Sequence, residues 1–82
     1  MQNSTSLKQA VLDVFQTHNP IKAPCLSVYQ PIVTDLLRYW SYEDTQGDVE
    51  LYLTDLFVYH HRKSVVLSKQ LVADVYACRA QF

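Results

Sequence analysis

A single glycine, Gly47, is the feature that most restricts the fold of this 82-residue chain. Tight β-hairpins and small β-barrels depend on glycine at turn positions where φ is positive, so a chain with one glycine is a poor candidate for either. Phosphate-cradling loops need several closely spaced glycines, which excludes that kind of nucleotide site. Because hydrophobic residues still make up 49% of the chain, we predict a folded core built without such turns.

Apolar residues recur in four segments at the three- and four-residue spacing of an amphipathic helix. The segments cover about residues 6–17, 30–41, 48–63 and 68–80. Ser6 and Ser68 stand where an N-cap hydroxyl accepts a backbone N–H, and Gln9 completes the pattern of a capping box with Ser6. Pro31 suits the first turn of the second helix.

The predicted fold is therefore all-α, a single helical domain over residues 1–82 in which four short helices form a compact bundle. Pro20 and Pro24 predict one longer irregular connection over residues 19–29. A β-hairpin over residues 57–67 is the alternative, because β-branched residues follow the third segment. The residues expected at the centre of the core are Val14, Leu36, Leu53, Leu56 and Val72.

Charge and cysteine content restrict the setting in which the chain works. The formal net charge is −1, which argues against a dedicated binder of nucleic acid. No apolar run approaches the roughly 20 residues needed to cross a bilayer, and the first residues lack the pattern of a secretory signal. Cys25 and Cys78 can form one bridge at most, so we expect two reduced thiols in a cytoplasmic protein without membrane contact.

The sequence offers little for metal or catalytic chemistry. It has no Cys-x-x-Cys or His-x-x-x-His pair, and the adjacent His60 and His61 would point about 100° apart on a helix. We therefore expect no metal and no cofactor. Nothing resembles a strained nucleophile turn or a glycine-built oxyanion loop, and four short helices leave little room for a pocket of about 300 Å³. We expect a protein without enzymatic activity.

Aromatic residues are abundant for so short a chain, with six tyrosines, three phenylalanines and one tryptophan. Tyrosine and tryptophan in excess of what a small core needs are typical of a surface that docks another protein. The competing interpretation is that they line the core with their hydroxyls in water. The residues expected to bind the partner are Tyr39, Trp40, Tyr42, Asp48, Tyr52 and Tyr59.

Five of the eight acids fall between Glu43 and Asp55, a span that contains no base. Such a span predicts a partner with a basic surface, although a solvated acidic face is the simpler interpretation. The predicted function is that of a non-catalytic protein–protein interaction module. It would be a small regulator or adaptor that binds, and inhibits or sequesters, a larger protein.

The alternative function is a small DNA-binding transcriptional regulator. Residues 59–63, Tyr-His-His-Arg-Lys, combine aromatic and basic side chains at the end of the third helix, a pattern that suits stacking on bases and neutralising phosphates. The neighbouring acidic span opposes such a footprint, so we expect direct DNA binding to be absent or weak. The residues that would carry this alternative are His61, Arg62, Lys63, Lys69 and Arg79.

The third helix also carries apolar residues on more than one side. Leu51, Val58 and Tyr59 lie off the stripe on which the core residues fall, so one small core cannot cover them all. We expect a homodimer that packs third helices together, while a foreign partner on the same face is the competing interpretation. The contacts expected in the dimer are Val49, Tyr52, Leu56 and Tyr59.

Overall fold

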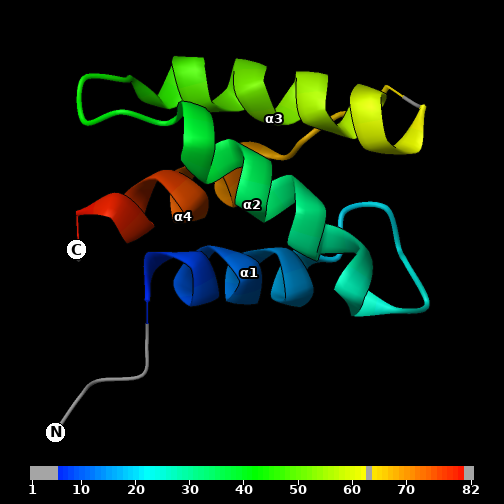
Figure 1. Ribbon diagram of the computed structural model, residues 1–82. Helices are drawn as coiled ribbons and strands as arrows, with labels where there is room; N and C mark the ends of the chain where they lie inside the picture. The colour runs from blue at the N-terminus through cyan, green and yellow to red at the C-terminus, as the bar shows by residue number, and fades with distance from the viewer. Residues whose placement is uncertain (1–5, 63, 81–82) are drawn as a thin grey trace, which may run out of the picture.

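The structure, a computed structural model, describes residues 6–62 and 64–80. Within these residues it is all-α, and the predicted bundle of four helices is confirmed (Figure 1). The helices are α1 (Leu7–His18), α2 (Gln30–Tyr39), α3 (Gln46–His61) and α4 (Lys69–Arg79), with a single 3-10 turn η1 (Leu26–Tyr29) before α2.

The hairpin alternative over residues 57–67 is wrong, because α3 continues to His61 and no strand occurs among the described residues. None of the helices in these residues has the length and apolar content required to span a bilayer.

Helices α2 and α4 each pack against both α1 and α3. Figure 1 shows α3 and α1 at opposite edges of the molecule, with α2 crossing between them in front and α4 behind. The candidate site described below lies between α2 and α3.

Local capping explains where the helices begin. Ser6 Oγ accepts the N–H of Gln9 at 3.2 Å, as predicted. The reciprocal half of that capping box is wrong, because the Gln9 amide donates to Asp13 at 2.8 Å instead. Helix α3 begins two residues earlier than predicted because Thr45 and Asp48 form a complete capping box, with side chain to backbone bonds of 3.2 and 2.9 Å.

Four of the five predicted core residues are buried: Leu36, Leu53, Leu56 and Val72. Val14 is only half-buried, because α1 turns a neighbouring set of residues inward. That set consists of Val11, Leu12 and Phe15.

Three aromatic rings from separate parts of the chain meet at the centre of the core. Tyr29 lies 5.6 Å from Phe15 and 6.3 Å from Phe57 between ring centroids, and none of the three is exposed. The Tyr29 hydroxyl donates to Asn19 Oδ1 at 2.6 Å and accepts the N–H of Ile21 at 3.2 Å. Tyr29 therefore fastens the long connection over residues 19–29 to the core.

Candidate functional site

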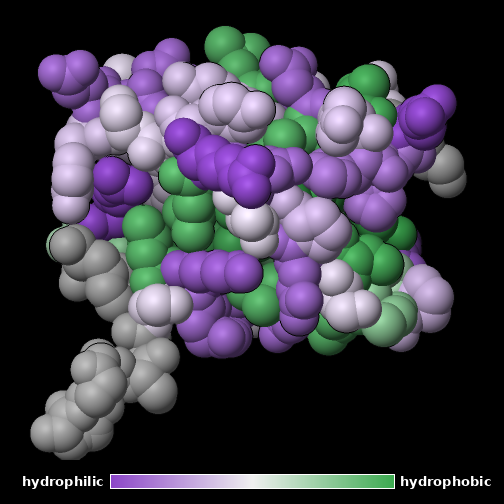
Figure 2. Space-filling model, viewed as in Figure 1, coloured by the Kyte–Doolittle hydropathy of each residue, from purple (hydrophilic) through white to green (hydrophobic). Residues whose placement is uncertain are grey.

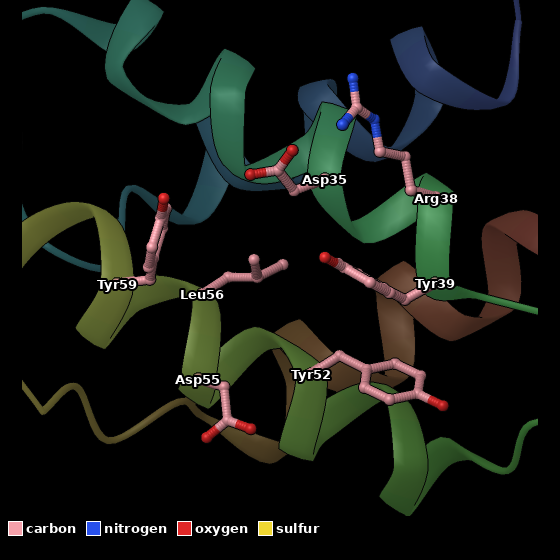
Figure 3. Close-up of a pocket in the computed structure, with 7 residues that line it drawn as sticks. All are labelled: Asp35, Arg38, Tyr39, Tyr52, Asp55, Leu56 and Tyr59. Atoms are coloured by element: carbon pink, nitrogen blue, oxygen red, sulfur yellow. The ribbon is translucent and has the colours of Figure 1, made fainter.

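An open groove of about 610 Å³ runs between α2 and α3 (Figure 3). Two of its tyrosines are largely in solvent, since Tyr39 is 62% exposed and Tyr59 is 74% exposed. The lining therefore brings together three of the six predicted partner-binding residues, Tyr39, Tyr52 and Tyr59. The complete lining is Asp35, Arg38, Tyr39, Tyr52, Asp55, Leu56 and Tyr59.

Helical spacing places these side chains on facing sides of the two helices. Asp35 and Tyr39 are four residues apart on α2, so both lie on the edge that faces α3. Tyr52 and Tyr59 are seven residues apart on α3, with Leu56 between them. In Figure 3, Leu56 and Tyr39 extend toward each other across the groove.

A hydrogen bond between side chains joins the two walls. His60 on α3 lies 2.8 Å from the Asp35 carboxylate on α2, measured from Nε2 to Oδ2. Both side chains are about one quarter exposed, so the pair is only partly screened by water. It fixes the spacing of α2 and α3 at the Tyr59 end of the groove.

The other end of the groove is acidic. The Tyr52 hydroxyl donates to Asp44 Oδ1 at 3.3 Å, and the Tyr52 ring lies 6.4 Å from that of Tyr39. Partial loss of solvent, together with the nearby Asp44 carboxylate, raises the pKa of Tyr52 above its ordinary value. The phenol therefore stays protonated, and the negative charge at this end belongs to the carboxylates.

The other predicted aromatic residues form a separate depression of about 400 Å³ between the end of α2 and the end of α4. Tyr42 is 77% exposed, and the Arg79 guanidinium lies 4.1 Å from its ring centroid. Trp40 differs from its predicted role as an exposed anchor, because it is only 4% exposed and stacks on Tyr76 at 6.2 Å. Five of the six predicted residues thus divide between two sites, and Asp48 lines neither.

Asp48 caps the beginning of α3. Its carboxylate accepts the backbone N–H of Thr45 in the capping box, so it is a structural acid at the beginning of the helix. It remains half-exposed beside Tyr52, where its negative charge also contributes to the raised pKa of that phenol.

The residues of the DNA-binding alternative are dispersed. Arg62 ends α3 and Arg79 ends α4, and Figure 1 shows these two helix ends on opposite sides of the molecule. Arg79 is held over Tyr42 and His61 stacks on Phe57 at 5.9 Å. Lys69 is exposed at the beginning of α4, and Lys63 lies outside the described residues. The described residues of this set do not form one basic patch.

The predicted dimer face is wrong in two of its four residues, because Val49 and Leu56 are buried in the core of the chain itself. Helix α3 packs on both α2 and α4, so its buried arc is wider than one apolar stripe. The exposed apolar residues of α3 are instead Leu51 at 64%, Val58 at 43% and Tyr59. Figure 2 shows separate hydrophobic patches at its upper edge, where α3 lies, with hydrophilic residues between them.

Across residues 6–62 and 64–80, no group of three or more His, Cys, Asp and Glu side chains is arranged to hold a metal ion. The α2–α3 groove is larger than the pocket size expected from the sequence, but it is an open trough between exposed side chains. Comparison of the chain with protein-family models, curated proteins and solved structures finds no match.

The groove contains acids that the sequence analysis did not assign to it. Asp35 lies four residues before Tyr39, and Asp55 lies between Tyr52 and Tyr59. Both spacings put the acid and the tyrosine on one side of a helix, so the signal is present in the sequence. The sequence does not indicate that α2 and α3 pack with these acid- and tyrosine-bearing sides facing each other.

Proposed function

We propose that this chain is a non-catalytic protein–protein interaction module, a small regulator or adaptor that binds a larger protein. The observation that carries the proposal is the convergence of exposed tyrosines from two helices on one groove. Tyr39 and Tyr59 offer large contact areas and lose little rotamer freedom when a partner covers them. Leu56 adds an apolar floor between them.

The partner's contact surface is basic in this proposal. Asp35 and Asp55 lie in the groove itself, and the acids at Glu43, Asp44 and Glu50 lie in the loop before α3 and on its first turns. A basic surface would be attracted by this charge distribution and would associate faster at low salt. Both cysteines of the chain are free thiols, which suits the proposed cytoplasmic setting.

Affinity measurement with matched tyrosine variants tests the proposal. The tagged chain is used to isolate its partner from the native host, and the purified partner is then titrated against wild type, the Tyr39→Ala/Tyr59→Ala variant and Tyr42→Ala. Tyr42 is the control because it is equally exposed but lies outside the groove.

We expect the double variant to bind at least about 30-fold more weakly, since each anchor contributes roughly 1–2 kcal/mol, and Tyr42→Ala to bind within about threefold of wild type. Equal affinities for all three proteins, with unchanged melting temperatures, would refute the proposal.

A second proposal concerns self-association, and it rests on the exposed apolar residues of α3. Leu51 and Val58 are two helical turns apart on one side, so an antiparallel pair of α3 helices would place Leu51 against Val58 of the partner subunit. The same arrangement would bring Glu50, near the beginning of α3, toward the partner subunit's Arg62. Light scattering behind a sizing column tests it: twice the monomer mass of 9.5 kDa supports the dimer, and 9.5 kDa at tens of micromolar refutes it.

A further inference from the structure

We propose that the α2–α3 groove accepts an arginine side chain from a basic segment of the partner protein. The inference rests on the proposed function and assigns the chemical group that the groove recognises. Three features of the groove carry it: acceptors for a guanidinium, aromatic faces at both ends, and a negative balance of charge.

The acceptors are carboxylates on both walls. His60 occupies Oδ2 of Asp35, and a carboxylate accepts several hydrogen bonds, so Oδ1 can take an N–H from an incoming group. Asp55 stands exposed on the α3 side of the same groove. A guanidinium donates through a planar fork of N–H groups, which matches carboxylates better than the compact ammonium of lysine does.

The aromatic faces and the floor suit the rest of the arginine side chain. Tyr39 and Tyr59 present exposed rings at the two ends of the groove, and an arginine packs its guanidinium on such faces. Leu56 forms an apolar floor between them, on which the methylene stem can lie. In Figure 3 the space above Leu56 is bounded by Tyr39, Tyr59 and the Asp35 carboxylate.

The balance of charge decides between occupants of opposite sign. Two carboxylates, Asp35 and Asp55, and one guanidinium, Arg38, line the groove, and in Figure 3 the Arg38 guanidinium and the Asp55 carboxylate are both directed away from Leu56. The acidic span from Glu43 continues the same sign beyond the groove. An acidic segment would meet these carboxylates without compensation, whereas a basic segment would be drawn to them.

The experiment is an NMR titration of the 15N-labelled full chain at low ionic strength with three capped heptapeptides. They share a glycine–serine sequence and carry at the centre arginine, lysine or citrulline, the last being a neutral analogue of arginine of the same shape. We expect amide shifts concentrated in residues 35–39 and 52–60. Arginine should bind about 5–10-fold more tightly than citrulline, and lysine should fall between them.

Matched variants distinguish binding in the groove from general attraction to acidic residues outside it. Tyr59→Ala and Asp55→Asn should each weaken arginine binding by about 3–5-fold. Tyr42→Ala and Glu43→Gln, which remove the same groups outside the groove, should change it by less than about twofold. Asp35 is left unaltered because its loss would also break the hydrogen bond with His60. Melting curves establish that each variant is folded.

The results that overturn the inference are distinct. Equal binding of the arginine and citrulline peptides would show general attraction to an acidic surface. So would a loss of arginine affinity in Glu43→Gln as large as the loss in Asp55→Asn. Groove amides that shift with protein concentration alone would show that a second copy occupies it. If arginine shows no preference in the peptide titration but the isolated partner still loses affinity when Tyr39 and Tyr59 are removed, the interaction module stands while the arginine assignment falls. If that dependence is also absent, both proposals fall.

Discussion

Replacing Tyr29 by phenylalanine tests the most specific feature of the core. The substitution keeps the ring, which stacks on Phe15 at 5.6 Å and meets Phe57 edge-on at 6.3 Å. It removes the hydroxyl, which donates to Asn19 Oδ1 at 2.6 Å and accepts the N–H of Ile21 at 3.2 Å. Asn19 Oδ1 keeps the N–H of Ala23 at 2.9 Å, so the loss falls mainly on Ile21.

The expected loss of stability follows from those two bonds. Each contributes about 1 kcal/mol net, and an N–H left without a partner in a half-buried position adds to the penalty, so the free energy of unfolding should fall by about 1–3 kcal/mol. A chain of 82 residues has a total stability of roughly 4–12 kcal/mol. The melting temperature should drop by about 5–20 °C.

Thermal and urea unfolding of wild type, Tyr29→Phe and Tyr42→Phe measure the effect. Tyr42 is the control because its ring is 77% exposed, and the loss of its hydroxyl should change stability by less than about 0.5 kcal/mol. An unchanged melting temperature for Tyr29→Phe would refute the inference that the hydroxyl fastens residues 19–29 to the core. A loss as large in Tyr42→Phe would also refute it.

Three further predictions concern stability, pH and nucleic acid. Leu56→Ala removes a buried side chain and should lower the free energy of unfolding by about 2–5 kcal/mol; an unchanged melting curve would contradict the placement of α3. Hydrogen bonds from His18 and Gln70 lower the pKa of Asp74, so the stabilisation by this carboxylate should be present above about pH 4 and lost as the pH falls further. Urea midpoints across that range should show this loss in wild type and much less of it in Asp74→Asn. Duplex DNA should bind weakly or not at all at 150 mM salt, a concentration near the physiological ionic strength of about 0.15 M, and submicromolar binding that Arg62→Ala abolishes would contradict this.

The four helices were predictable from the sequence because their signals are local. Ser6 and Ser68 cap the helices they precede, and the apolar spacing that follows each of them belongs to one element. The error in the predicted beginning of α3 also concerns a local capping signal. Thr45 and Asp48 form a capping box in which aspartate takes the place of the usual glutamate, and the predicted segment began only at residue 48.

Long-range packing accounts for what the sequence did not predict. Tyr29 stands beside a helix start with no periodic pattern around it, and its burial depends on Phe15 and Phe57. Trp40 is covered by Tyr76, which lies 36 residues further along the chain. Neither contact leaves a trace in the spacing of nearby residues.

In the candidate site, too, the local signals were predictable from the sequence and the packing between helices was not. The sequence indicated the surplus of tyrosines, but only the packing of α2 against α3 separates the groove tyrosines from Tyr42. The dimer face failed for a related reason. Helix α3 touches two neighbours, so Val49 and Leu56 are both buried and the exposed apolar residues fall on the opposite side.

Site-specific photo-crosslinking in the native host tests the central claim most directly. A benzoyl-phenylalanine would replace Tyr39 or Tyr59 in the groove, and Asp13 on the exposed side of α1 as the control position. The account predicts that both groove positions crosslink to the same foreign protein and that position 13 does not. Crosslinks to that protein from all three positions, or from neither groove position, would contradict the assignment of the α2–α3 groove as the protein-binding site.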